Sequence, residues 1–290
     1  MFACLAALAG GIPGRAAEGR AQESAQALLA RAIAGQHHAD AALAEFERLE
    51  RKQLRSKGRV SEDRTYRVVP TGTGTLRLVR ETNGQAVAPE FYRKQLRELE
   101  QALVWALTPA ESKQRQRVEK FQRRQKERRE LVEAVGRAFL ATRLGEETRG
   151  GRSVVKLQLD PNPDFKPKTR MEELFTRVRA TAWVDAASGQ MARLEAEVTS
   201  DISFFGGIAG KIFRGSRVLI EQSEAAPGIW LPVRYETNIT GRRFVFGFEL
   251  RESILIRNYA RIGAPQQALA AVRRELTAAS ASPGNGEAPR

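Results

Sequence analysis

Period-two alternation of apolar and polar residues over residues 177–259 constrains the fold of this chain more than any other feature. The clearest run is ARLEAEVT at 192–199, in which every second residue is apolar. Successive side chains of a strand point to opposite faces, so this pattern indicates strands with one buried face and one face in water. We therefore predict five consecutive antiparallel strands in this range.

The five predicted strands differ in the apolar residues that they carry. The first covers 177–185, the second 192–199, and the third contains Val218 and Ile220. The fourth has alternate residues on one face: Ile229, Leu231, Val233, Tyr235, Thr237 and Ile239. The fifth has three phenylalanines and a leucine on one face: Phe244, Phe246, Phe248 and Leu250.

Shorter alternating runs precede this block and indicate a sheet of more than five strands. Residues 43–49 are apolar at every third position, as in a helix. The turn-like sequence SKGR at 56–59 and the alternating run after it favour a hairpin, so we predict a strand at 45–55. Asn83-Gly84 is a further hairpin signal, because both residues tolerate positive φ.

Three longer segments have helical periodicity. Residues 22–35 place apolar side chains on one face, and Gly35 is expected to end this helix. A helical insertion is predicted at about 89–139, and its second half is dense in Lys and Arg. Residues 265–290 predict a short helix and then a disordered tail of small residues. About ten strands interrupted by one helical block indicate an α+β fold with a large curved antiparallel sheet.

The first 21 residues have the form of a secretion signal peptide. Residues 2–12 are apolar, a Pro-Gly pair interrupts them, and small residues before Gln22 provide a cleavage site. The segment lacks a basic start, which leaves open a start site further upstream. We expect export to the periplasm or cell envelope, with residues 22–264 forming a single domain.

Several kinds of chemistry are excluded by the residues that this chain lacks. Cys4 is the single cysteine and lies inside the predicted signal, so the mature chain would have no disulfide, zinc–thiolate site or thiol nucleophile. The two histidines, His37 and His38, are adjacent and point in different directions, so they are poor joint metal ligands. No serine-nucleophile motif is present. We expect a protein that is not an enzyme and that uses no cofactor and no metal.

The net charge of +14 suits anionic lipid headgroups, an acidic protein or nucleic acid, although general arginine richness gives the same balance. Export argues against nucleic acid. The basic residues are concentrated in 113–137, which predicts either a solvated helix with intrahelical ion pairs or a contact surface for lipid phosphates or an acidic partner. The contact residues of that surface would be Arg123, Arg124, Arg128 and Arg129.

Three stretches carry a resemblance to a known group of proteins. They are RATAWVDAASGQMARLEAE at 179–197, GIWLPVRYE at 228–236 and SKGRVSEDRTYRVVP at 56–70. They resemble secreted bacterial proteins with a LolA/LolB-like fold, the outer-membrane lipoprotein-sorting group. The resemblance implies an unclosed β-barrel whose concave, apolar face is covered by helices and holds the acyl chains of a lipid or lipoprotein. The long basic block within 89–137 departs from that pattern.

Two functions are then expected, both of them binding functions. The first is to hold an acyl chain in an apolar half-barrel cavity. The residues expected to line or gate that cavity are Phe204, Phe205, Ile208, Phe213, Leu231, Tyr235, Phe244, Phe246 and Phe248. The alternative is an interaction or sensor module that binds a protein partner through the basic helix. An apolar face filled by the protein's own helices would favour the second function.

Overall fold

A computed structural model of the chain describes residues 23–56, 58–108, 112–204, 210–244 and 246–281. The predicted signal peptide, Phe205 and Ile208 lie outside these ranges. The strands are β1 (Phe46–Ser56), β2 (Arg59–Pro70), β3 (Thr75–Thr82), β4 (Gln85–Ala86), β5 (Phe139–Arg149), β6 (Arg152–Pro161), β7 (Val178–Asp185), β8 (Met191–Val198), β9 (Ile202–Phe204), β10 (Gly210–Ile212), β11 (Arg217–Ala226), β12 (Ile229–Arg243) and β13 (Phe246–Arg261). The helices are α1 (Ala25–Ala42), α2 (Pro89–Leu107), α3 (Ser112–Ala138), α4 (Arg170–Glu173) and α5 (Pro265–Ala281).

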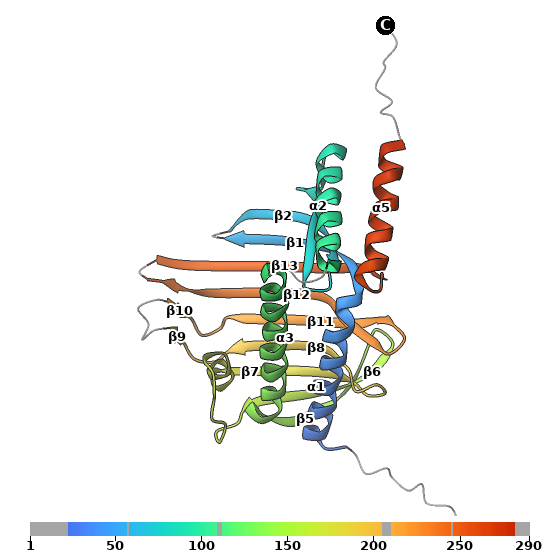
Figure 1. Cartoon of the computed structure of the whole chain (residues 1–290). Helices are drawn as coiled ribbons and strands as arrows, with labels where there is room; N and C mark the ends of the chain where they lie inside the picture. The colour runs from blue at the N-terminus through green and yellow to red at the C-terminus, as the bar shows by residue number, and fades with distance from the viewer. Residues whose placement is uncertain (1–22, 57, 109–111, 205–209, 245, 282–290) are drawn as a thin grey trace, which may run out of the picture.

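The strands form one antiparallel sheet. Its 13 strands follow the order β4-β3-β2-β1-β13-β12-β11-β8-β7-β6-β5, with β9 and β10 attached beside β12 (Figure 1). The two ends of this path, β4 and β5, do not pair with each other within the described residues, so the sheet stays open. The α+β fold with a large, unclosed antiparallel sheet is as predicted.

The five strands predicted from alternation are found as β7, β8, β11, β12 and β13, and the predicted strand at 45–55 is β1. The five are not consecutive as predicted, because the short strands β9 and β10 lie between β8 and β11. One residue is misplaced by that prediction. Phe244 lies in the turn between β12 and β13 with a φ of 54°, and not on the face of the fifth strand. A tight reversal between twisted strands needs left-handed backbone, and Phe244 supplies it here.

The first helix is longer than predicted, because Gly35 does not end it. Helix α1 continues to Ala42. A side chain at Gly35 would meet the Gln190 amide, with the Oε1 atom only 2.3 Å from the added Cβ. The glycine therefore lets α1 approach the turn between β7 and β8, which is a contact far away in the sequence.

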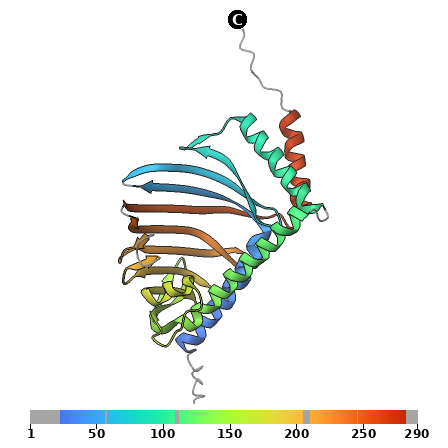
Figure 2. The same cartoon turned by 60° about the vertical axis from the view of Figure 1, so that its left-hand side comes forward.

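Helices α1 and α3 lie side by side and cross the strands on one face of the sheet, here named the helix side (Figures 1 and 2). The core on this side joins Leu28, Leu29 and Ala32 of α1 to the alternate apolar residues of two strands. Those strand residues are Val155, Leu157, Leu159, Ala180, Ala182 and Val184. The alternation that predicted the strands therefore also supplies the surface on which α1 packs.

Helices α2 and α5 pack on the opposite face, here named the reverse side, beside β2 and β3. Val68 and Val69 are both buried although adjacent strand residues point to opposite faces. Val69 joins a second core, whose helical members are Leu96, Leu99, Leu103, Ala268 and Val272. The helical block predicted at 89–139 is thus divided, since α2 packs against α5 on one face while α3 lies on the other.

Asp185 anchors the turn between β7 and β8. The carboxylate is buried and accepts hydrogen bonds from the Ser188 backbone N–H (2.8 Å), the Ser188 hydroxyl (2.7 Å) and Arg152 Nε (2.7 Å). Burial raises the pKa of Asp185, but the hydrogen bonds from Arg152 and Ser188 outweigh burial and hold that pKa below its usual range. The charged form of Asp185 therefore stabilises the turn.

Replacing Asp185 by Asn is expected to lower the free energy of unfolding at pH 7. Because the folded-state pKa is lowered, the contribution of Asp185 is present above its unfolded-state pKa of about 3.9 and is lost as pH falls through the folded-state value. Urea titrations from pH 7 to pH 2 should show the difference between wild type and Asp185→Asn shrinking below about pH 4. A difference that is constant across this range would contradict the assignment.

Replacing Leu28 by Ala is expected to lower the free energy of unfolding by about 2–5 kcal/mol, because it leaves a cavity between α1 and the sheet. Leu28 is 2% exposed, whereas Leu144 on the edge strand β5 is 52% exposed. Leu144→Ala is the matched control and should change stability little. Equal losses in the two variants, measured by chemical denaturation, would show that α1 does not pack as described.

Candidate functional site

An apolar surface on the helix side continues beyond α1 along the long central strands. It begins in the core beneath α1 and passes from strand to strand through directly opposed pairs, such as Leu194 with Ile220 and Ile239 with Leu250. All of its side chains are half-buried. We name it the apolar stripe, formed by Leu194, Ala196, Val218, Ile220, Ile239, Phe248, Leu250 and Ile254.

The stripe is left uncovered because the strands are much longer than a helix is wide. Strands β12 and β13 have 15 and 16 residues, which corresponds to about 50 Å of length. A helix with its side chains is about 10 Å across. Helix α1 crosses these strands near one end, and the strands extend well beyond both α1 and α3 (Figure 2). None of the helices in the described ranges therefore packs on the far part of the apolar face.

Exposed aromatic side chains lie at the end of the sheet to which the stripe leads. Phe246 is 76% exposed, Phe244 55% and Phe213 36%. Strand β10 brings Phe213 to this end, because the Phe213 N–H donates to the Thr240 carbonyl at 2.9 Å. We name Phe213, Phe244 and Phe246 the aromatic tip. The backbone of Phe204 belongs to β9 at the same end, paired with Gly210 of β10.

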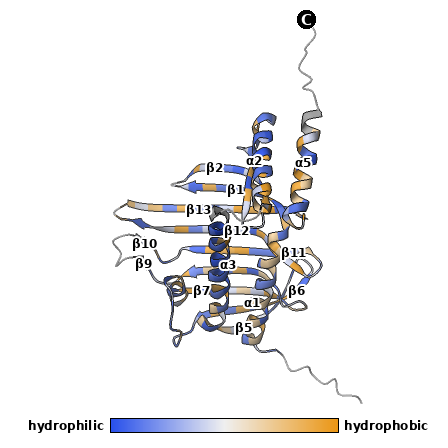
Figure 3. Cartoon of the chain, in the orientation of Figure 1, coloured by the Kyte–Doolittle hydropathy of each residue, from blue (hydrophilic) through white to orange (hydrophobic). Residues whose placement is uncertain are grey.

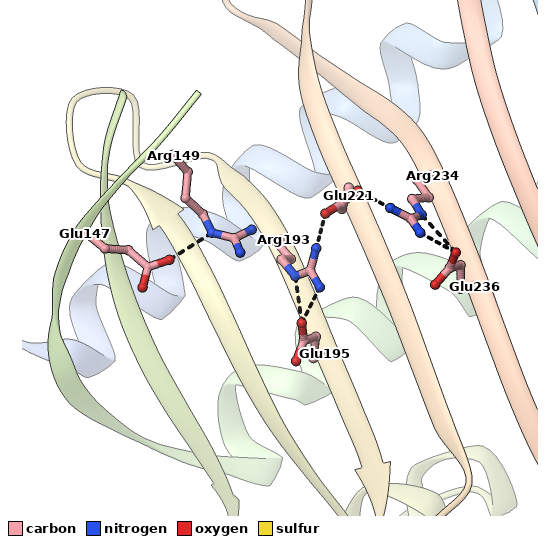
Figure 4. A network of polar contacts seen from close by, with 7 residues as sticks. All are labelled: Glu147, Arg149, Arg193, Glu195, Glu221, Arg234 and Glu236. Carbon is pink, nitrogen blue, oxygen red and sulfur yellow. Dashed lines mark hydrogen bonds and ion pairs between the residues drawn. The ribbon is translucent and has the colours of Figure 1, made fainter. Parts of the chain in front are cut away.

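The reverse side has the opposite chemistry. A hollow of about 1180 Å³ spans β1, β13, β12, β11, β8 and β7, and its lining is rich in arginine, glutamate, threonine and asparagine. Figure 4 shows part of the charge network on this face, in which Arg193 pairs with Glu195 and Glu221. Glu197 pairs across the ladder with Arg217 at 3.0 Å, as expected for the polar face of these strands. Such a polar surface does not suit an acyl chain.

A buried polar cluster lies on the helix side where the sheet meets α1 and α3. Glu50 accepts hydrogen bonds from Arg48 Nε at 2.8 Å and from Arg77 Nη2 at 3.0 Å. Arg128 of α3 donates to both carboxylate oxygens of Asp40 of α1, at 2.6 and 2.8 Å. The bidentate geometry ties α3 to α1 at this point.

Two tyrosines adjoin this cluster. Burial raises the pKa of Tyr235 and of Tyr259, so both phenols stay neutral at neutral pH. The Tyr259 hydroxyl donates to the Pro232 carbonyl at 2.5 Å. Neither tyrosine is therefore set up as a base, and both serve as packing and hydrogen-bonding groups.

The residues predicted to line one acyl cavity are divided among three places. Phe213, Phe244 and Phe246 are together at the aromatic tip, and Phe248 lies in the adjoining stripe. Leu231 is 0% exposed and packs against Ala39 and Phe46 beneath α1. Tyr235 lies between these groups, opposite Ile254.

The predicted basic contact residues are on α3, the most hydrophilic of the long helices (Figure 3). Arg123, Arg124 and Arg129 are exposed, whereas Arg128 is held by Asp40. Arg123 lies 3.8 Å from Glu127, and Lys126 lies 3.8 Å from Glu130, so two intrahelical ion pairs are formed as well. The helix therefore has both intrahelical ion pairs and exposed arginines that could contact a partner, so each of the two alternative predictions fits part of it.

Sequence reasoning missed the buried cluster of Arg48, Glu50 and Asp40. The available signal was in β1, where FERLERK places charged residues at both odd and even positions. A strand with charges on both faces must pair some of them inside the fold. Within the described ranges, no group of three or more His, Cys, Asp or Glu side chains could hold a metal ion.

No described helix is both long enough and apolar enough to cross a membrane. No protein-family model and no curated protein sequence matches the chain. Solved structures do resemble it. A LolA superfamily protein from Nitrosomonas europaea has 9% identity and a TM-score of 0.34, over 85% of this chain and 97% of that one.

Two further solved structures are similar. A putative outer membrane lipoprotein-sorting protein domain from Vibrio parahaemolyticus has 8% identity and a TM-score of 0.31, over 80% of this chain and 92% of that one. The MucA/MucB complex of Pseudomonas aeruginosa gives 9% identity and a TM-score of 0.22, over 80% and 94%. These likenesses concern the fold and assign no ligand to this chain.

Replacing Arg128 by Ala should lower the free energy of unfolding by about 1 kcal/mol, because it leaves the nearly buried Asp40 carboxylate without its partner. Arg129→Ala removes the same charge from the next residue of α3 and should change stability by less than about 0.5 kcal/mol. Chemical denaturation of both variants measures the difference. Identical stabilities would show that the Arg128–Asp40 contact does not join α3 to α1.

Proposed function

We propose that this protein is a non-catalytic binding protein of the bacterial cell envelope that holds an acyl chain of a lipid or lipoprotein against the apolar stripe. The observation that carries the proposal is the stripe itself, a half-buried apolar surface that begins at the α1 core with Leu194 and Ala196 and continues over β11, β12 and β13 to parts of these strands on which none of the described helices packs. Uncovered apolar surface of this extent is typical of binding sites.

The stripe has apolar side chains over a length comparable to that of an acyl chain. From Ile254 to Phe246 the strand β13 advances eight residues, or about 26 Å, and on this face of β13 one charged residue, Glu252, interrupts the apolar ones and pairs with Lys52 at 3.1 Å. Each methylene removed from water contributes about 0.8 kcal/mol, so a long chain lying on this surface gains several kcal/mol without covalent chemistry. The aromatic tip at the far end would make the first contact with a membrane or with a lipidated protein, because its rings are already exposed.

The proposal includes a location for the protein, the cell envelope. Residues 1–21 have the form of a signal peptide, and an acyl-binding surface is useful where lipids and lipoproteins cross the aqueous envelope. The chain would act there as a carrier or receptor and not as an enzyme.

Two single substitutions on the stripe side, Phe246→Asp and Leu250→Asp, are expected to weaken binding of a fluorescent fatty acid at least tenfold. Each removes apolar contact worth about 1.5–3 kcal/mol. The control is Leu255→Asp, since Leu255 is adjacent to Ile254 but lies on the reverse side and is 48% exposed. Fluorescence titration measures the affinities, and circular dichroism checks the fold. Equal affinities in all three variants and wild type would overturn the acyl site.

A second candidate function is to bind an acidic protein partner through α3. The observation that favours it is that Arg123, Arg124 and Arg129 project into solvent from a helix with few acidic residues. Exposed charges of one sign steer an oppositely charged partner and give binding that weakens with salt.

Charge reversal of Arg123, Arg124 and Arg129 to Glu should abolish salt-sensitive capture of an acidic partner from a periplasmic extract. Arg128 is left in place because it joins α3 to Asp40. The control reverses three exposed arginines of the β1–β2 hairpin instead, Arg55, Arg59 and Arg64. If both triple variants capture the same proteins as wild type, α3 is not a partner surface.

A further inference from the structure

A second hollow adjoins the buried polar cluster of Arg48, Asp40 and Arg128, at the end of the sheet away from the aromatic tip. Its volume is about 690 Å³, and it is enclosed by the end of α1, the β2–β3 turn, the end of α2 and the first half of α3. The basic side chains of its lining are Arg48, Arg117, Lys120, Arg124 and Arg128, and the one acidic side chain is Asp40. We name it the basic pocket.

The acidic groups near this pocket are already engaged. Both oxygens of Asp40 accept hydrogen bonds from Arg128. Glu50, which pairs with Arg48, is shared with Arg77. Positive charge therefore remains in excess at the pocket, and an anion entering it meets no competing carboxylate.

Arg48 carries a buried donor that no described residue satisfies. The residue is 8% exposed, and its Nε donates to Glu50 at 2.8 Å, but its Nη1 is buried without a hydrogen-bond partner. Buried polar groups are almost always paired in folded proteins, so this guanidinium N–H is available to an acceptor from outside the chain, a water molecule or a ligand. Arg48 is also part of the pocket lining.

The rest of the lining mixes polar side chains, Thr71, Thr73, Thr75 and Gln125, with apolar and aromatic ones. Trp105 and Phe121 contribute rings, and Leu43 and Leu76 contribute aliphatic side chains. The Arg117 guanidinium lies over the Trp105 ring at 4.7 Å. The pocket is within the size range of small-molecule sites, about 300–1000 Å³, and combines a few charged groups with apolar walls.

We propose that the basic pocket binds the phosphate group of a small molecule or lipid headgroup, with Arg48, Lys120 and Arg124 as its ligands. Arginine forks match tetrahedral phosphate oxygens and form charge-assisted hydrogen bonds with them. The apolar walls contact the organic part of the ligand. The pocket shares no lining residue with the apolar stripe, so this site can exist whether or not the stripe binds acyl chains.

The test measures binding of inorganic phosphate by isothermal titration calorimetry. The pocket variant Lys120→Gln with Arg124→Gln should bind phosphate at least tenfold more weakly than wild type. The control variant Arg115→Gln with Lys126→Gln removes two charges from the same helix outside the pocket lining and should bind like wild type. Absence of phosphate binding to wild type, or equal weakening in the two variants, would overturn the pocket.

Arg48→Lys tests the orphaned donor directly, because it keeps the charge and removes the guanidinium fork. It should weaken phosphate binding at least tenfold while the protein stays folded by circular dichroism, and unchanged binding would contradict the role of Arg48. Soluble dihexanoyl phosphatidic acid distinguishes the two sources of phosphate. Affinity at least tenfold above that of inorganic phosphate supports a lipid headgroup, and equal affinity supports a free phosphate compound.

Discussion

The structure depends on one sheet whose two faces have opposite chemistry. Alternate residues of β7, β8 and β11 are apolar on the helix side and charged on the reverse side. The apolar face has to be covered, and α1 does this with Leu28, Leu29 and Ala32. Helix α1 runs from β5 to β12 and ends against Phe46 of β1, but a helix with its side chains is only about 10 Å wide, so it covers just one end of the long strands. The stripe along β11–β13 is the part on which no described helix packs.

The charged reverse side favours a single register of the strands. Over the centre of the sheet this side faces water, with none of the described helices packed on it. Each ion pair on such a surface contributes little to stability. Together the ion pairs favour one pairing register of the strands, because a slip of one residue would bring arginines and glutamates against α1. At the β2–β3 end the reverse side is apolar instead, and there α2 and α5 cover it. The helices are thus placed where each face is apolar.

Alternation and turn chemistry were sufficient to predict the strands, because both are local. The Asn83-Gly84 turn has positive φ at both residues, as its sequence requires. The failures involve contacts between distant parts of the chain. Gly35 looked like a helix end, but it is small because Gln190 packs against α1.

The candidate site was predictable only in part for the same reason. The pattern identified the apolar face, but it did not tell which part α1 would cover, so Leu231 was grouped with exposed Phe246. Glu50 and Asp40 were missed because their partners Arg77 and Arg128 come from other elements, β3 and α3.

The most direct test of the acyl site is photo-crosslinking with a fatty acid that carries a diazirine along its chain, followed by peptide mapping. The account predicts labels on the helix side of β12 and β13, at Ile239, Phe248 and Leu250. Labels on the reverse side at Leu219 and Leu255, or no saturable labelling at all, would contradict it.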